Sequence, residues 1–161
     1  MTLLDLQNKL IKEIETILCE VHFMDYNRNK KRIKGYLQTI PIRLSETITE
    51  EYTEYVEPEK ELAPFFIVKV VEADFSDERN EATVDILFQI FDDDMEMQGY
   101  YTLFSLLEKV RERFSKNNVL EEYYCDNKFT IALQDNDTYP FFFAGMEMKW
   151  NLPGIEKEEF F

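Results

Sequence analysis

One ten-residue stretch decides the fold, and it reads Ala82-Thr83-Val84-Asp85-Ile86-Leu87-Phe88-Gln89-Ile90-Phe91. Side chains alternate between the two faces of a strand, so its apolar residues fall on one face: Val84, Ile86, Phe88 and Ile90. The other face carries Asp85, Leu87, Gln89 and Phe91. The pattern predicts a strand with one face in the core and a second face that is only partly polar.

The residues after this strand predict a charged turn and then a helix. Asp92, Asp93, Asp94 and Glu96 make the turn too charged to continue the strand. Residues 100–114 carry apolar side chains three or four positions apart, at Leu103, Leu106, Leu107, Val110 and Phe114. This spacing is typical of an amphipathic helix that covers a sheet.

Working outward, the same periodicities predict one further helix and several strands. Residues 2–21 form a second amphipathic helix, with Thr2 and Asp5 suited to its N-terminus. Alternating apolar residues predict strands in 39–49, 65–75, 129–133 and 139–150, and the turn at 76–81 predicts an antiparallel hairpin. We therefore expect an α+β fold, an antiparallel sheet of about four to five strands with two amphipathic helices packed on one face.

The second faces of these strands are more aromatic than two helices can cover. The residues assigned to this second face are Phe66, Leu87, Phe91, Phe141 and Phe143. A sheet face in water is expected to be polar, so either a loop folds over these residues or another chain does. We favour another chain, which makes them candidate subunit-interface residues.

Size and charge limit the function classes. The 161 residues fit one domain, 1–161, with a short tail at 154–161, and 33 acidic against 18 basic side chains give a net charge of −15. Such a chain repels nucleic acid overall. The acidic N-terminus does not resemble a signal peptide, no run is long enough to span a membrane, and the two cysteines are widely separated. These features predict a cytosolic protein with reduced thiols.

Two charged segments interrupt the periodic pattern. The connection 22–38 contains a run of five bases, Arg28, Lys30, Lys31, Arg32 and Lys34. It is either a solvated turn or a contact with an acidic neighbouring subunit or nucleic acid, and the turn is the more frequent case. Residues 46–62 are acidic and predict a second edge strand or an extended arm that includes Glu50, Glu51 and Glu54.

No residue pattern predicts catalysis. The turn Asp92–Asp94 lacks the ligand spacing and glycine of a calcium loop. Cys19 and His22 lie one turn apart, but a cysteine on an amphipathic helix is far more often simply packed. There is no phosphate-binding glycine loop, zinc spacing or nucleophile elbow. We expect no enzyme, cofactor or metal site.

Several short motifs resemble the tail terminator, or tail completion, proteins of long-tailed bacteriophages and prophages. The matching pieces are Ile86–Asp92, Gly99-Tyr100 followed by the helix to Val110, Ile131–Asp135, and Tyr139-Pro140 with the strand to Trp150. An amphipathic helix at the start also fits. The resemblance covers residues 1–21 and 65–153, and the basic run and the acidic segment have no counterpart in it.

The resemblance implies a structural function. Such proteins form a ring, commonly a homohexamer, on the end of a finished tail tube, stop its polymerisation and join it to the head connector. It implies assembly in the host cytoplasm and residence in the virion. Under this hypothesis Glu50, Glu51, Glu54, Asp92, Asp93 and Asp94 line the channel, and the five bases meet an acidic neighbour. Carboxylates would let DNA pass without binding it sequence-specifically.

The charge also admits a second function class. An acidic inhibitor, such as a protein that mimics DNA by presenting phosphate-like carboxylates, has the same composition. It would be a monomer or dimer with a basic partner, whereas the tail protein would self-associate into a ring.

Overall fold

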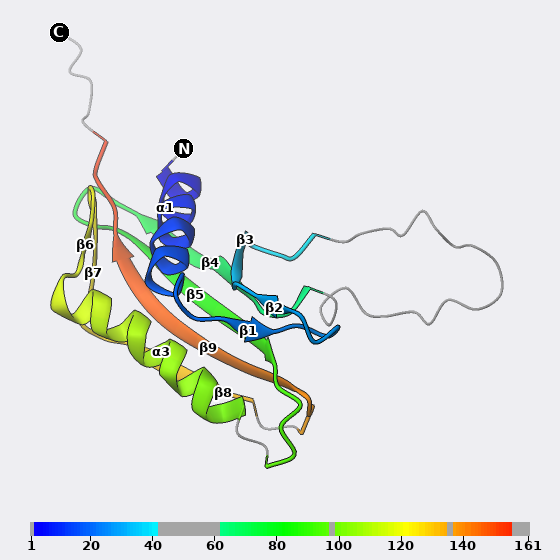
Figure 1. Ribbon diagram of the computed structural model, residues 1–161. Coiled ribbons are helices and arrows are strands. Elements are labelled where there is room, and N and C mark those ends of the chain that lie inside the picture. The colour runs from blue at the N-terminus through cyan, green and yellow to red at the C-terminus, as the bar shows by residue number, and fades with distance from the viewer. Residues whose placement is uncertain (1, 42–61, 97–98, 135–136, 156–161) are drawn as a thin grey trace, which may run out of the picture.

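The computed structural model describes residues 2–41, 62–96, 99–134 and 137–155 (Figure 1). Two helices lie on a mainly antiparallel sheet, which confirms the predicted α+β class. The helices are α1 (Thr2–Ile17) and α3 (Gly99–Lys116). The long strands are β4 (Phe65–Phe75), β5 (Asn80–Phe91) and β9 (Phe141–Asn151). The short strands are β1 (Phe23–Met24), β2 (Lys30–Lys31), β3 (Lys34–Leu37), β6 (Val119–Leu120), β7 (Tyr123–Cys125) and β8 (Thr130–Leu133).

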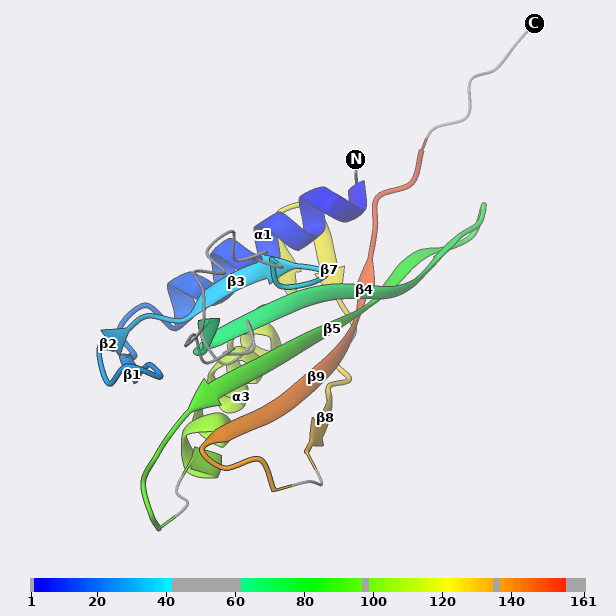
Figure 2. The ribbon, with the colours of Figure 1, turned by 90° about the vertical axis from the view of Figure 1, so that its right-hand side faces the viewer.

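Strand β5 is the centre of the sheet. It pairs with β4 in the predicted antiparallel hairpin, with Val68 opposite Ile86, and with β9 along its whole other edge, with Ile86 opposite Met146. Strand β4 has a bulge between Val70 and Glu72, which adds twist to the end of the hairpin. Figure 2 shows this end extending beyond the body of the molecule. We call residues 71–79 the hairpin arm.

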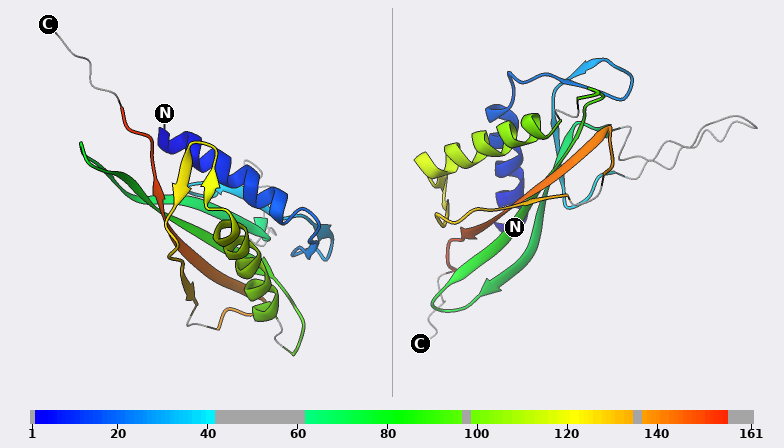
Figure 3. Two further views of the ribbon diagram at one scale, coloured as in Figure 1. Left: turned by 90° about the vertical axis from the view of Figure 1, so that its left-hand side faces the viewer. Right: turned by 90° about the horizontal axis from the view of Figure 1, so that it is seen from below.

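Both helices pack on the same face of the sheet, as the right-hand view of Figure 3 shows. Leu6, Leu10 and Ile14 of α1 are completely buried together with Val84 and Ile86 of β5. The apolar stripe predicted for α3 is buried as well, and the Phe114 ring meets the Trp150 indole edge to face at 5.3 Å. Each such side chain contributes about 1.5–3 kcal/mol of transfer free energy when it is fully buried. The predicted inner face of β5 is therefore confirmed.

The described residues form about nine strands, so the expected four to five was too low. The additional strands are short pieces such as the hairpin of β1 and β2 and the hairpin of β6 and β7. The last described strand before β4 is β3, which pairs parallel to it and ends at Leu37, before the predicted strand 39–49 begins. Residues 39–41 are not in a strand, and 42–49 lie outside the described residues.

Helix α1 is held at both ends by polar contacts. Near its N-terminus the Lys9 ammonium lies 2.8 Å from Asp5, 2.6 Å from Glu121 and 3.0 Å from Glu122, which join the helix to the turn between β6 and β7. Hydrogen bonds to these carboxylates, that to Asp5 foremost, raise the pKa of Lys9. At the other end Glu15 accepts a hydrogen bond from the Gly35 amide at 3.0 Å. Among the described helices, neither is long and apolar enough to cross a membrane.

Gly35 is needed where β3 passes between α1 and the core. A Cβ added there would lie 2.5 Å from Cζ of Phe66 and 2.8 Å from Cγ2 of Ile11. We predict that Gly35→Ala lowers the free energy of unfolding by about 1–3 kcal/mol, because the packed Phe66 ring and the Ile11 methyl group must shift to make room. Gly154→Ala is the matched control, since its Cβ would meet only Asn80 Nδ2, at 3.4 Å. Equal midpoints in urea unfolding for the two variants would contradict this account.

Candidate functional site

The sheet face opposite the helices carries an apolar row that crosses five strands. The register places Tyr36, Ile67, Leu87, Gly145 and Ala132 side by side, one residue from each of β3, β4, β5, β9 and β8. Leu87 is 39% exposed and leans over Gly145, where an added Cβ would lie 3.0 Å from its methyl carbon. We call this set the outer row. It is a partly exposed apolar surface on the side of the sheet away from both helices.

One end of this outer face is covered by the chain itself. Phe91 and Phe141 are buried in a second small cluster with Leu62 and Ala63, and their rings meet edge to face at 5.4 Å. Phe143 packs against this cluster and stays partly exposed. The excess aromatic surface was expected to be covered either by a loop of the same chain or by another chain. At this end of the sheet, a segment of the same chain covers it. The exposed part of the predicted interface is Leu87 with Phe143.

The assignment of Phe66 to the outer face was wrong. Its side chain is completely buried on the helix side, with its ring 5.7 Å from that of Phe88. Phe65 points outward instead and joins the small cluster of Phe91 and Phe141. The start of β4 is apolar on both faces, so its alternation alone did not reveal which phenylalanine faces the helices.

Beside the outer row, two carboxylates face each other across β5 and β9. Asp85 pairs in register with Glu147 on one side and with Lys69 on the other. Burial, together with the charge of Glu147, raises the pKa of Asp85 above its ordinary value, and Lys69 opposes this only in part. The arrangement places negative charge next to an apolar strip.

The acidic turn and the basic run, which are far apart in sequence, meet in the structure. A guanidinium nitrogen of Arg28 lies 3.2 Å from a carboxylate oxygen of Asp93. Asp92 accepts a hydrogen bond from the Asp94 amide and Asp94 accepts one from the Glu96 amide, both at 3.0 Å. These carboxylates therefore organise their own turn, and one base of the predicted interface has an acidic partner within its own chain.

The other predicted charges are distributed around this end of the molecule. Lys31 donates to the Leu62 carbonyl at 3.2 Å, and the Lys34 ammonium lies 5.3 Å from the centre of the Tyr36 ring. Lys30 and Arg32 are exposed and have no carboxylate within ion-pair distance in the described parts of the chain. Glu50, Glu51 and Glu54, the other predicted channel residues, lie outside the described residues.

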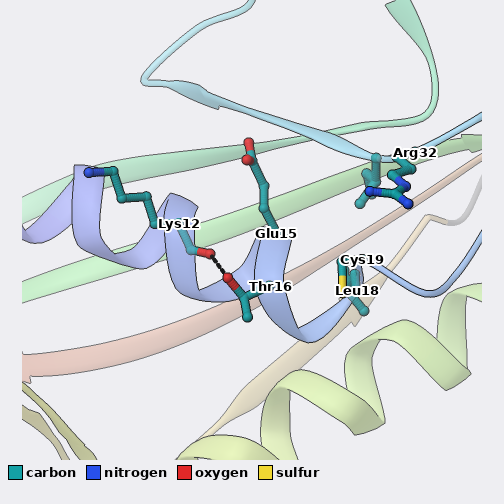
Figure 4. Close-up of a pocket in the computed structure, with 7 residues that line it drawn as sticks. Lys12, Glu15, Thr16, Leu18, Cys19 and Arg32 are labelled. Carbon is teal, nitrogen blue, oxygen red and sulfur yellow. Dashed lines mark hydrogen bonds between the residues drawn. The ribbon is translucent and has the colours of Figure 1, made fainter.

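A surface pocket of about 540 Å³ opens where α1 ends (Figure 4). Its apolar part is made by Leu18 and Ile33, and Lys12 and Arg32 bring two positive charges to it. Its remaining lining residues are Glu15, Thr16 and Cys19. The Thr16 hydroxyl donates to the Lys12 carbonyl at 2.8 Å, so it is already used by the helix. No sequence pattern predicted this pocket, because it forms between two segments that are separated along the chain.

The two cysteines have different surroundings. Cys125 is buried, and desolvation raises the pKa of its thiol to about 11, so it stays protonated at neutral pH. Cys19 is exposed at the pocket, and His22 is not among the residues that line it. The described residues include no group of three His, Cys, Asp or Glu side chains arranged to hold a metal ion.

No protein-family model matches this chain, and no curated protein matches it. The resemblance carried by the short motifs therefore stays a prediction. The surface features of the described residues on which a proposal can rest are the outer row, the carboxylate pair, the pocket and the hairpin arm.

The carboxylate pair gives a pH-dependent prediction. A carboxyl group whose pKa is raised by folding destabilises the fold above that raised pKa, and the cost disappears below the ordinary value of 3.8. We expect Asp85→Asn to increase the free energy of unfolding at pH 7 by up to about 1 kcal/mol, as is typical of partly exposed charges. The gain should vanish at pH 3. Urea unfolding at both pH values measures it, and a gain that grows on acidification would refute the assignment.

Proposed function

We propose that this protein is a structural assembly protein that caps a phage tail tube as a ring, ends its polymerisation and forms the surface that joins the head. The observation that carries the proposal is the outer row, because an apolar strip across a sheet face is a surface that a partner covers. The order of strand, acidic turn, Gly99-Tyr100 and helix supports the particular class.

The outer row favours association over catalysis. Its members are apolar or small side chains, and the charged groups beside it are Asp85, Glu147 and Lys69, which lie on described strands that contain no serine, cysteine or histidine. Both helices are used on the opposite face, so covering Leu87 requires a further element. In a ring, each copy supplies that element to the next through two different surfaces.

The charge distribution suits a passage for DNA. With a net charge of −15 the ring would present carboxylates to the nucleic acid, and no counterions would be released to bind it. Asp92, Asp93 and Asp94 are the described residues proposed to line the channel. Arg28 pairs with Asp93 and neutralises part of the charge of this turn. We therefore propose that Asp92 and Asp94 supply the negative charge that faces the DNA.

A tube-capping assay tests the function. Tail tubes assembled from the tube protein of the same phage or prophage are incubated with this chain, and electron microscopy counts capped ends and tube lengths. We predict that the wild type caps one end and stops elongation. Leu87→Asp should reduce capping at least tenfold, because a charge enters the apolar row.

Val119→Asp is the matched control, since Val119 is an exposed apolar residue of β6, 46% exposed, and not part of the outer row. It should cap as the wild type does. Tubes that keep growing in the presence of the wild-type protein would overturn the proposal. Tight binding to a basic protein without effect on tubes would favour the acidic inhibitor instead.

A further inference from the structure

We infer that the hairpin arm of one copy docks in the pocket beside α1 of the next copy. This contact specifies how the proposed ring is built, so it rests on the proposed self-association. The occupant is a second copy of this chain, which contributes residues 71–79 as a protruding, acidic and partly apolar element.

The hairpin arm exposes two large apolar side chains to solvent. Phe75 is 60% exposed and Val71 is 53% exposed, although both lie in or beside a regular ladder with β5. The arm also carries Glu72, Asp74 and Glu78, all exposed. Its base, Arg79, pairs with Glu81 and lies 3.6 Å from Asp126. The register places Phe75 on one face of the arm with Ala73, and Glu72 and Asp74 on the other face, so the arm presents an exposed aromatic ring on one face and carboxylates on the other.

The outer edge of β4 is also open along the arm. Strand β3 pairs with β4 only as far as Val68. Beyond it the Gln38 side chain completes the edge, because its carbonyl oxygen accepts from the Val70 amide at 2.7 Å. No described strand pairs with the outer edge of Val71–Phe75. The arm is thus available to a partner through its edge as well as its side chains.

The pocket has the complementary chemistry. Leu18 and Ile33 of its lining are themselves buried, so the chemistry that the pocket offers is that of Lys12 and Arg32, which can meet carboxylates. Neither cation has an ion-pair partner in the described parts of the chain. Glu15, the one carboxylate of the lining, is held by the Gly35 amide at 3.0 Å. Figure 4 shows Arg32 on the segment that faces the helix end carrying Leu18 and Cys19, while the Lys12 ammonium points away from both.

The two surfaces lie at opposite ends of the molecule. Figure 2 shows the tip of the hairpin arm at one end and the end of α1, beside β1 and β2, at the other. A contact between two different surfaces is heterologous, so each copy keeps one surface free for the next neighbour. Repetition gives a closed ring or a filament, whereas a contact of one surface with itself would stop at a dimer.

The exposed Cys19 at the pocket allows a direct test by cross-linking. Glu78→Cys places a thiol at the tip of the arm, and Cys125 is buried. Copper phenanthroline then oxidises the full-length variant at concentrations where the wild type self-associates. We expect a ladder of trimers and larger species on a non-reducing gel, because each copy has both an arm and a pocket.

Two control variants make the result specific. Glu78→Cys combined with Cys19→Ser should lose at least nine tenths of the species above dimers. Glu112→Cys places a thiol on the exposed side of α3 and should give no ladder. A wild type that self-associates while Glu78→Cys gives no more multimers than Glu112→Cys would overturn the docking and leave the proposed function standing. A wild type that neither self-associates nor caps tubes would overturn both.

A charge exchange provides a second, independent readout. Arg32→Glu and Glu78→Arg should each weaken self-association, by about two- to fivefold, as befits exposed ion pairs. The double variant should recover most of the wild-type affinity at low salt, measured by sedimentation. Equal weakening in the double variant, without recovery, would show that the two residues do not meet.

Discussion

The structure depends on the pairing of β5 with β4 and β9 while one face of all three strands is buried. Ile86 and Phe88 are enclosed by neighbouring strands at both sides and by the helix layer above. Because side chains alternate, a one-residue slip of β5 would exchange its apolar inner face for Asp85, Leu87 and Gln89. This constraint fixes the register, and the register in turn places both the outer row and the carboxylate pair.

Using both helices on one face has a functional consequence. The segment that includes Leu62 and Ala63 covers one end of the opposite face, but Leu87 remains exposed in the middle of it. The bulge in β4 directs the hairpin arm away from the body, which exposes Phe75 near its tip. The arm carries exposed carboxylates, and the pocket at the other end of the molecule carries Lys12 and Arg32, so the two surfaces proposed to join copies have opposite charge.

The long elements were predicted well from the sequence. Strands β5 and β9 are long enough to show a hydrophobic period of two residues, and the two helices are long enough to show one of 3.6. Strands of two residues, such as β1 and β6, carry no period and were missed. Phe66 was misplaced because Phe65 and Phe66 are chemically equivalent neighbours, and only the tertiary structure decides between them. The ion pair of Arg28 with Asp93 and the pocket join segments distant in sequence, so no local pattern predicted them. Where alternation was clear, as at Leu87, the predicted face was right, and the role of this face as a subunit interface stays a prediction.

The proposed ring requires that this chain assemble head to tail through two different surfaces. Native mass spectrometry of the unmodified protein across a concentration series tests it most directly, with negative-stain images of the same samples. We expect species larger than dimers that converge on one closed ring. A strict monomer, or a dimer that grows no further at any concentration and in the presence of tail tubes, would contradict it.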